Sequence, residues 1–211
     1  EETGQATGYK ANGTINLALG DARREQLLRS HDHAVRMGIE TSLLSREELQ
    51  EKWPWIETDD VKSAFFVPSN GQVNALDVTT ALSKGARSNG AQIFENTKVT
   101  SLVIRNGKVA GVETDKGTIA TDKVLLAGGM WSHLFAKAHG VTVPLHATEH
   151  FYIVTEPVAG LPKDQPILNI AEERTYWKED TGKLLIGSFE KLGKPYGADG
   201  IPEDFEFDEL P

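Results

Sequence analysis

Residues 123–133 of the chain read KVLLAGGMWSH. The unbroken apolar run at residues 124–127 is typical of a strand that is buried on both faces of a parallel sheet. Gly128 and Gly129 follow it, and a glycine pair at the carboxyl end of such a strand permits positive φ angles and leaves backbone atoms open to a ligand. Residues 132–139 have the pattern of a short helix. The segment therefore predicts a strand, a glycine turn and a helix, either packed without a ligand or with a ligand at the turn.

Composition restricts the class of protein. A chain of 211 residues of which 39% are hydrophobic can bury a sizeable core in one or two domains. Its 22 Lys and Arg against 31 Asp and Glu give a formal charge of −9, which argues against a nucleic-acid surface and against an anionic membrane partner. Without cysteine, the chain has no disulfide and no thiolate ligand or nucleophile. We expect a cytoplasmic location, or the mitochondrial matrix in a eukaryote.

Local patterns near the start of the chain predict strands alternating with helices. Residues 14–19 alternate apolar and polar side chains, which indicates a half-buried strand. Asp21 is the expected N-cap of the helix that follows. Ser45 and Glu48 have the spacing of a capping box, which predicts a second short helix. Residues 64–67 are expected to form another strand.

Two groups of side chains in this region allow more than one interpretation. His31 and His33 stand two residues apart on the first predicted helix, where they point to different faces, so we predict no metal site. The large side chains of Trp53, Trp55 and Ile56 either line a ligand or pack beneath a loop.

The pattern changes at Asn74. Asn74 or Asp77 is expected to cap a helix with one apolar face, and a short strand is expected at residues 92–95. Turn sequences that include Asn106-Gly107 then separate three alternating runs, which predicts a three-stranded antiparallel meander. The predicted strands of the meander are residues 98–105, 108–114 and 117–121.

This order of elements resembles the middle of the D-amino-acid-oxidase-like FAD oxidoreductases, and within them the branch of dimethylglycine and sarcosine dehydrogenases. The resemblance runs along nearly the whole chain. The motifs that carry it are GQVN at 71–74, LSKGAR at 82–87, NTKV at 96–99, AGGMW at 127–131, EHFY at 149–152 and DGIPEDF at 199–205.

The resemblance implies a mixed α/β fold made of two interwoven domains. Residues 75–143 would form the middle segment of an FAD/NAD(P)-binding-type domain, including its sheet segment and β-meander. Residues 1–74 and 144–211 would form an antiparallel-sheet substrate domain, or cap.

The resemblance also implies where FAD would bind. The backbone of Val99 would face the adenine, and the segment with Ala127, Gly128, Gly129 and Trp131 would lie along the pyrophosphate and the ribityl chain. These residues are the expected cofactor-binding set.

Three further residues are expected on the substrate side of the flavin. Amine oxidation by hydride transfer requires a neutral nitrogen, and a histidine suits the role of proton acceptor. By the resemblance, His150 would take this role, Tyr176 would position the substrate and Tyr152 would contribute to substrate binding. Alternate residues of a strand share a face, so His150 and Tyr152 are expected on one face. The other interpretation of His150 is a core histidine bonded to backbone.

Nearby charged residues remain open in the sequence. Glu149 is either an ion-pair partner or solvated, while Arg174 and Lys178 are either carboxylate ligands or surface charges. Residues 176–179 and 184–189 are expected to form a hairpin. The acidic stretch 203–209 is expected to be an exposed edge.

Departures from the family pattern point to an internal fragment. No Gly-x-Gly-x-x-Gly motif, which would supply the phosphate-binding turn, occurs in the sequence, and Phe151 stands where Gln is common in the family. The expected partners are the missing N- and C-terminal segments of a parent chain and a small amine substrate. The expected function is part of an FAD-dependent oxidation of an N-methyl amine; the alternative is a non-catalytic binding or assembly module.

Overall fold

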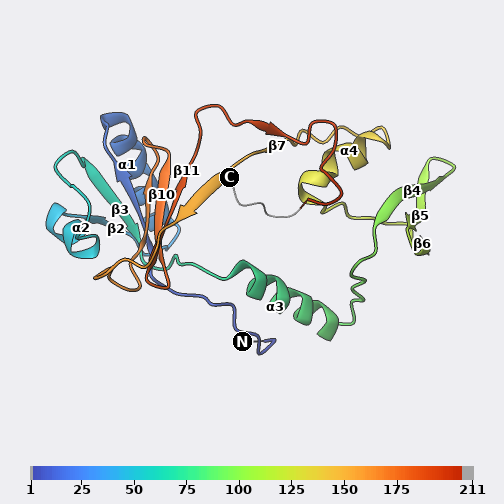
Figure 1. Ribbon diagram of the computed structural model, residues 1–211, viewed down its shortest axis with the longest axis horizontal. Coiled ribbons are helices and arrows are strands. Elements are labelled where there is room, and N and C mark those ends of the chain that lie inside the picture. The colour runs from blue at the N-terminus through green and yellow to red at the C-terminus, as the bar shows by residue number, and fades with distance from the viewer. Residues whose placement is uncertain (1, 206–211) are drawn as a thin grey trace. The chain divides into compact units, whose positions relative to one another are not determined.

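The structure is a computed structural model in which residues 2–205 are described (Figure 1). The chain divides into two compact units. Unit 1 consists of Glu1–Ala91 and His150–Lys191, and unit 2 consists of Gln92–Glu149 and Leu192–Pro211. The elements of each unit are described separately below. Together they give the mixed α/β class that the sequence predicts.

Unit 1 is built on a seven-stranded mixed sheet with the strand order β2-β3-β1-β9-β10-β11-β8. Only β1 and β9 are parallel, and every other neighbouring pair in this sheet is antiparallel. Its strands are β1 (Thr14–Ala18), β2 (Ser42–Leu44), β3 (Ser63–Val67), β8 (Phe151–Val154), β9 (Ile167–Ile170), β10 (Thr175–Asp180) and β11 (Lys183–Ser188). The expected strands at residues 14–19 and 64–67 and the expected hairpin are thus confirmed.

The main core packs on one face of this sheet. Ile15, Leu17 and Leu168 point to that face and are buried against Leu49 and Trp53, which lie in and just after α2 (Arg46–Lys52). The predicted capping box of α2 is confirmed, because the Ser45 side chain accepts from the Glu48 amide while the Glu48 carboxylate accepts from the Ser45 amide. Among the three large side chains of this region, Trp53 is therefore a core residue.

The opposite face of the sheet is covered over β1 and β3 by α1 (Asp21–Arg36), whose Leu27 packs on Phe65 and Val67. The expected N-cap of α1 is wrong. Gly20 occupies that position, and the Glu172 carboxylate accepts hydrogen bonds from the amides of Leu19 and Gly20 at 2.6 and 2.7 Å. A residue far along the chain thus holds the backbone just before α1, and no side chain caps the first turn of the helix.

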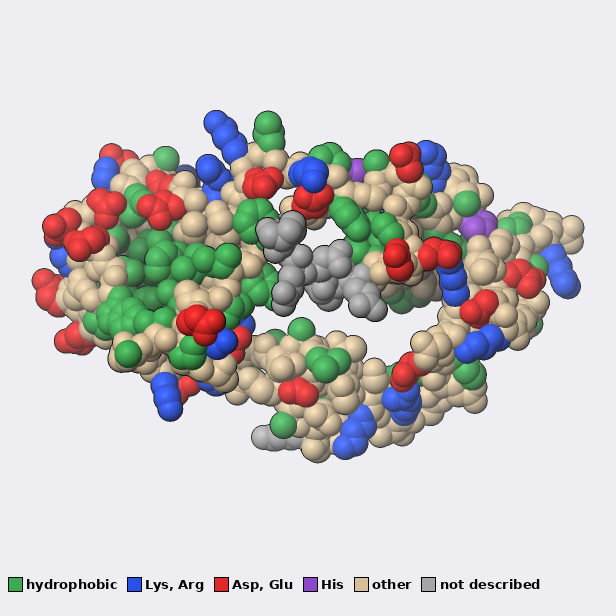
Figure 2. Space-filling view, in the orientation of Figure 1, with side chains coloured by type: hydrophobic (Ala, Val, Ile, Leu, Met, Phe, Trp, Pro, Cys, Tyr) green, Lys and Arg blue, Asp and Glu red, His purple; other side chains and the backbone are tan. Residues whose placement is uncertain are grey.

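The third helix of unit 1, α3 (Ala75–Ser88), begins as predicted at Asn74, whose side chain accepts from the Asp77 amide. None of its residues is buried. Leu76 and Leu82 are 75% and 69% exposed, so its apolar face has no cover among the described residues. Figure 2 shows further hydrophobic side chains gathered at the surface over the seven-stranded sheet.

Unit 2 contains the predicted meander, formed by β4 (Val99–Arg105), β5 (Lys108–Thr114) and β6 (Gly117–Ala120). Asn106 and Gly107 both have positive φ, as the tight turn between β4 and β5 requires. His139 joins the meander to α4 (Ser132–Lys137), since one ring nitrogen accepts from the Leu102 amide at 3.0 Å and the other donates to the Phe135 carbonyl at 2.8 Å. A two-stranded sheet of β7 (Ala147–Thr148) and β12 (Pro195–Tyr196) completes the unit.

Two predicted strands are wrong. Residues 92–95 are not in a strand, and neither is the apolar run at residues 124–127, where Leu125 is 91% exposed. A strand buried in a parallel sheet needs hydrogen-bonding strands beside it and covering layers on both faces. The described residues supply neither around 124–127. The apolar run alone therefore does not make a strand here.

Candidate functional site

One row of residues crosses the seven-stranded sheet of unit 1. The strand register aligns Asn16 with Asn169, Asn169 with Tyr176, Tyr176 with Gly187, and Gly187 with Tyr152. Residues paired in this way point to the same face of a sheet. This face is opposite to the one that carries the main core. The row therefore presents amide and phenol side chains on the face that α1 covers only over β1 and β3.

The ring of Tyr176 lies across β11 at Gly187. A Cβ atom built on Gly187 would overlap Cε1, Cζ and Oη of Tyr176. Burial, and secondarily the negative charge that Tyr152 would carry, raise the pKa of the Tyr176 phenol above its ordinary value. The Tyr176 hydroxyl therefore remains a proton donor at neutral pH.

His150 lies beside these phenols. Its imidazole is stacked on Phe189, with ring centroids 4.3 Å apart and planes at 8°, and its centroid is 6.3 Å from that of Tyr176. The Tyr176 and Phe189 centroids are 5.8 Å apart. The structure thus brings together His150, Tyr152 and Tyr176, which the sequence placed in one site, and adds Phe189. We call these four residues the aromatic cluster.

The aromatic cluster has the chemical means to bind a small cationic or N-methylated ligand. Ring faces attract cations, an imidazole exchanges protons near neutral pH, and a phenol donates a hydrogen bond. Within residues 2–205, neither the His150 ring nor the Tyr176 hydroxyl makes a hydrogen bond to another residue. His150 and Tyr152 are exposed. Both polar groups are therefore available to a ligand.

Sequence analysis did not identify Phe189 or Gly187 as site residues. The signal that could have found them is the alternation of residues 184–189 on the expected hairpin, which puts both residues on the same face.

The structure also places the charged residues whose roles were open in the sequence. Arg174 donates from Nε to the Phe189 carbonyl at 3.0 Å, so it fixes the backbone under the cluster. Lys178 lies 3.7 Å from Asp180, and Glu149 pairs with Lys194 at 2.8 Å.

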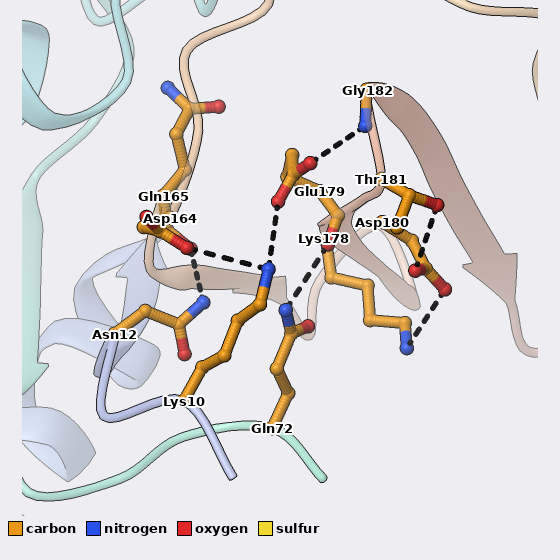
Figure 3. A network of polar contacts seen from close by, with 10 residues as sticks. All are labelled: Lys10, Asn12, Gln72, Asp164, Gln165, Lys178, Glu179, Asp180, Thr181 and Gly182. Carbon is orange, nitrogen blue, oxygen red and sulfur yellow. Dashed lines mark hydrogen bonds and ion pairs between the residues drawn. The ribbon is translucent and has the colours of Figure 1, made fainter. Parts of the chain in front are cut away.

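A polar network holds the far end of the β10–β11 hairpin (Figure 3). The Glu179 carboxylate, only 2% exposed, accepts from the Gly182 amide at 2.8 Å and lies 3.7 Å from Lys10 Nζ. Lys10 also pairs with Asp164 at 3.4 Å. Gln72 donates to the Glu179 carbonyl. The hairpin that carries Tyr176 is thereby tied to the N-terminal segment and to the loop before α3.

The expected cofactor-binding residues all belong to unit 2. Val99 begins β4 and is 43% exposed, and Ala127 is exposed in the irregular segment before the short 3₁₀ helix η1 (Gly129–Trp131). Gly129 has a φ of +52°, and a Cβ built there would meet open space. Backbone at Gly129 is therefore uncovered, whereas a Cβ built on Gly128 would lie 3.3 Å from Ser132 Oγ, so only Gly129 of the pair leaves room for a cofactor along the backbone.

A cavity of about 190 Å³ adjoins this glycine turn in unit 2. Trp131, His133, Leu134 and Tyr196 are among its lining residues. Phe205 contacts two of these lining residues, edge-on to Trp131 with centroids 6.3 Å apart and tilted against Tyr196 with centroids 5.7 Å apart. Glu203 pairs with Lys98 at 2.7 Å, so the start of the acidic stretch is held in place, while residues 206–209 lie outside the described residues.

Two kinds of site are missing from the described part of the chain. Among residues 2–205, no group of three or more His, Asp or Glu side chains is arranged to hold a metal ion. No helix in that range has the length and apolar character needed to cross a membrane.

Comparison with known proteins matches this chain to curated relatives along most of its length. It is 35% identical to the mitochondrial pyruvate dehydrogenase phosphatase regulatory subunit of Mus musculus, covering 95% of this chain and 23% of that protein. It is 32% identical to 4-methylaminobutanoate oxidase (formaldehyde-forming) of Paenarthrobacter nicotinovorans, covering 96% and 24%. It is 30% identical to human mitochondrial dimethylglycine dehydrogenase, covering 97% and 25%. The chain thus spans about a quarter of these relatives.

Solved structures and a family model agree with these matches. The crystal structure of L-proline dehydrogenase from P. horikoshii superposes with a TM-score of 0.80 at 25% identity, covering 92% of this chain and 51% of that one. The model of the FAD dependent oxidoreductase family, DAO, matches residues 1–210. The resemblance stated from the motifs and its implied cofactor, FAD, are confirmed. The chain belongs to the FAD-dependent oxidoreductases of the DAO family.

Proposed function

We propose that this chain is part of an FAD-dependent oxidoreductase that oxidises a secondary or tertiary N-methyl amine, dimethylglycine-like or sarcosine-like, by hydride transfer to flavin. The observation that carries the proposal is the aromatic cluster, in which Tyr152 and Tyr176 share one sheet face and His150, just before β8, lies beside Tyr176. Relatives whose names specify sarcosine, dimethylglycine or 4-methylaminobutanoate support the substrate class.

In this proposal each member of the cluster has a separate role. His150 accepts the proton of the substrate ammonium, so that the nitrogen lone pair becomes available. Tyr176 donates a hydrogen bond that positions the substrate, and Tyr152 lines the same face. Phe189 holds the imidazole plane. A bound FAD would supply the hydride acceptor.

We propose that FAD is held by Val99 and by the turn with Ala127, Gly128, Gly129 and Trp131. The open backbone at Gly129 supports this assignment. The glycine fingerprint for the pyrophosphate would come from another part of a parent chain, which agrees with the chain's spanning about a quarter of its relatives.

The domain assignment is likewise a proposal. We assign residues 1–74 and 144–211 to the substrate domain and 75–143 to the FAD-binding domain. Division into two compact units with changes of unit after residues 91 and 149 supports this plan. The two divisions differ over residues 75–91, which belong to unit 1, and over residues 144–149 and 192–211, which belong to unit 2.

We propose that other segments of a parent chain cover the apolar surfaces that are exposed here. Leu76 and Leu82 of α3 and Leu125 beside the glycine pair are between 69% and 91% exposed. Large aliphatic side chains at such exposure are typical of surfaces that are covered in the complete protein. The relatives from Mus musculus are named as mitochondrial, so a matrix location is proposed if the source is a eukaryote.

The test of the proposed chemistry is His150→Ala in the full-length parent. Loss of a general base is expected to slow flavin reduction by the amine about 10²-fold or more. FAD retention is expected to change little, because the cofactor contacts are assigned elsewhere. His33→Ala, at an exposed position of α1, is the matched control. Equal loss of flavin reduction and FAD retention would show a structural histidine instead.

A binding or assembly module is the second candidate. It is favoured by the 35% identity to a protein that is named as a regulatory subunit. Mixing the 211-residue chain with excess FAD distinguishes the two candidate functions by whether the chain binds the cofactor. A perturbed visible flavin spectrum supports a partly built site, and an unchanged spectrum favours the module.

A further inference from the structure

We infer that Gly187 is a positioning residue that sets where the Tyr176 phenol lies. The importance of Tyr176 for catalysis rests on the proposed function. The spatial relation between Gly187 and Tyr176 does not depend on that function. Gly187 lies in the interior of β11, between Tyr176 on β10 and Tyr152 on β8. Glycine weakens a strand interior, so its presence there requires a reason.

Backbone conformation does not supply that reason. Gly187 is not among the glycines with a positive φ, so its backbone is accessible to any L-amino acid. Leu185, two residues earlier on the same face of β11, carries a large buried side chain. This face of the strand therefore accepts a side chain at the nearest equivalent position.

Space for the side chain supplies the reason. Every one of the three atoms nearest to a Cβ at position 187 belongs to the Tyr176 ring or its hydroxyl. The ring thus occupies the place that a side chain at 187 would take. With glycine there, the phenol can lie flat across β11 on the way to Tyr152. With any other residue, the phenol has to move.

The displaced ring would also lose its neighbours. Tyr176 is held laterally by Phe189, at 5.8 Å between centroids, and His150 lies 6.3 Å away. Movement off β11 changes both separations. Gly187 therefore controls the relation between the phenol and the imidazole, although it contacts no substrate itself.

The test measures ring contacts in the 211-residue chain by nuclear Overhauser effects. In the wild type, we expect contacts from the Tyr176 ring to the Gly187 α-protons and to the Phe189 ring. In Gly187→Ala, the contact between Tyr176 and Phe189 is expected to weaken several-fold. Gly85→Ala on the exposed helix α3, where only the Thr3 methyl group is near, is the matched control and is expected to leave the contact unchanged. An unchanged contact in Gly187→Ala overturns the inference.

A second variant covers the case in which Gly187→Ala does not fold. Combining it with Tyr176→Ala removes the overlapping ring, so the double variant is expected to fold with the amide spectrum of the Tyr176→Ala single variant. If the double variant also fails to fold, a side chain at 187 is excluded by something other than Tyr176, and the inference is wrong.

Kinetics in the full-length parent separate this inference from the proposed function. Displacement of the phenol in Gly187→Ala is expected to lower the rate of flavin reduction at saturating amine about tenfold. A displaced ring with an unchanged rate would leave the positioning by Gly187 intact and remove Tyr176 from the proposed function. An undisplaced ring would refute the positioning by Gly187 and leave the proposed function standing.

Discussion

The imidazole of His150 lies parallel to the ring of Phe189, with centroids 4.3 Å apart. Stacked aromatic pairs contribute about 0.5–1.5 kcal/mol beyond the area that they bury. This pair restrains the plane of the residue that is proposed to accept the substrate proton. Arg174 in turn restrains the backbone of Phe189.

Phe189→Leu in the full-length parent is expected to lower the rate of flavin reduction several-fold to about tenfold, because the imidazole loses a flat surface that keeps its orientation. FAD content should not change. Phe189→Tyr keeps the ring and is the matched control. Stopped-flow reduction of the flavin measures the rate, and similar rates in the Leu and Tyr variants would show that stacking has no role.

Ionisation of Tyr176 is expected to destabilise unit 1 at alkaline pH. Burial raises the pKa of this phenol in the folded chain, so the folded state holds the proton more tightly than the unfolded state. The contribution of the neutral phenol to the free energy of unfolding is complete below the ordinary phenol pKa of about 10. It is lost as the pH rises through the higher pKa of Tyr176 in the folded chain. Urea unfolding at a series of pH values should show this loss in the wild type and a smaller one in Tyr176→Phe. Tyr9→Phe, at an exposed tyrosine, should resemble the wild type.

Lys10→Met is expected to lower the free energy of unfolding by about 1–3 kcal/mol, because it leaves the Glu179 carboxylate buried without its cation. This loss in the free energy of unfolding is smaller than that expected for a fully buried ion pair, because the Lys10 side chain is 43% exposed. Lys178→Met removes a lysine whose partner Asp180 is 49% exposed, and it should cost less than about 1 kcal/mol. Equal destabilisation by the two variants in urea unfolding would contradict this account of the network.

Trp53→Phe is expected to destabilise the chain by about 1–3 kcal/mol. The indole is 1% exposed, and its Nε1 donates to the Pro166 carbonyl at 2.9 Å, so the variant leaves a buried carbonyl without a donor. Trp53→Ala should cost about 3–5 kcal/mol because it also opens a cavity. Trp55→Phe, at a residue that is 48% exposed, should change stability by less than about 0.5 kcal/mol. Thermal or urea unfolding distinguishes these outcomes.

Local sequence patterns predicted the local elements well, because their determinants lie close together in the chain. The Ser45–Glu48 capping box, the Asn74 cap and the Asn106-Gly107 turn each depend on residues no more than three positions apart. The alternation along residues 14–19 likewise predicted the strand β1, but the expected half-burial is wrong, because Thr14 and Ala18 on one face are buried as well as Ile15 and Leu17 on the other.

Features that depend on distant residues were not predictable in this way. The carboxylate that binds the two amides before α1 comes from Glu172, which no pattern near Gly20 reveals. The apolar run at residues 124–127 has the composition of a buried strand, yet composition cannot supply the strands and layers that such a strand needs. Burial of Trp53 against Pro166 also depends on a contact across more than a hundred residues.

The candidate site likewise combines features that local sequence predicts with features that depend on distant residues. Alternation along a strand predicted that His150 and Tyr152 would share a face, and the family resemblance added Tyr176. Their common neighbourhood depends on the order β10-β11-β8 and on the register that aligns Tyr176, Gly187 and Tyr152. Strand order is a property of the whole sheet, so Phe189 and Gly187 became visible only with the fold.

β8 is the last strand of the seven-stranded sheet, and its four residues Phe151–Val154 are between 40% and 59% exposed. No strand among residues 2–205 pairs with its outer side. An uncharged terminal strand of this kind is a template for a strand from another molecule. Purified in isolation, the chain is therefore expected to form multimers as its concentration increases, and light scattering on a dilution series, with Ile153→Lys as the solubilising variant, would detect them.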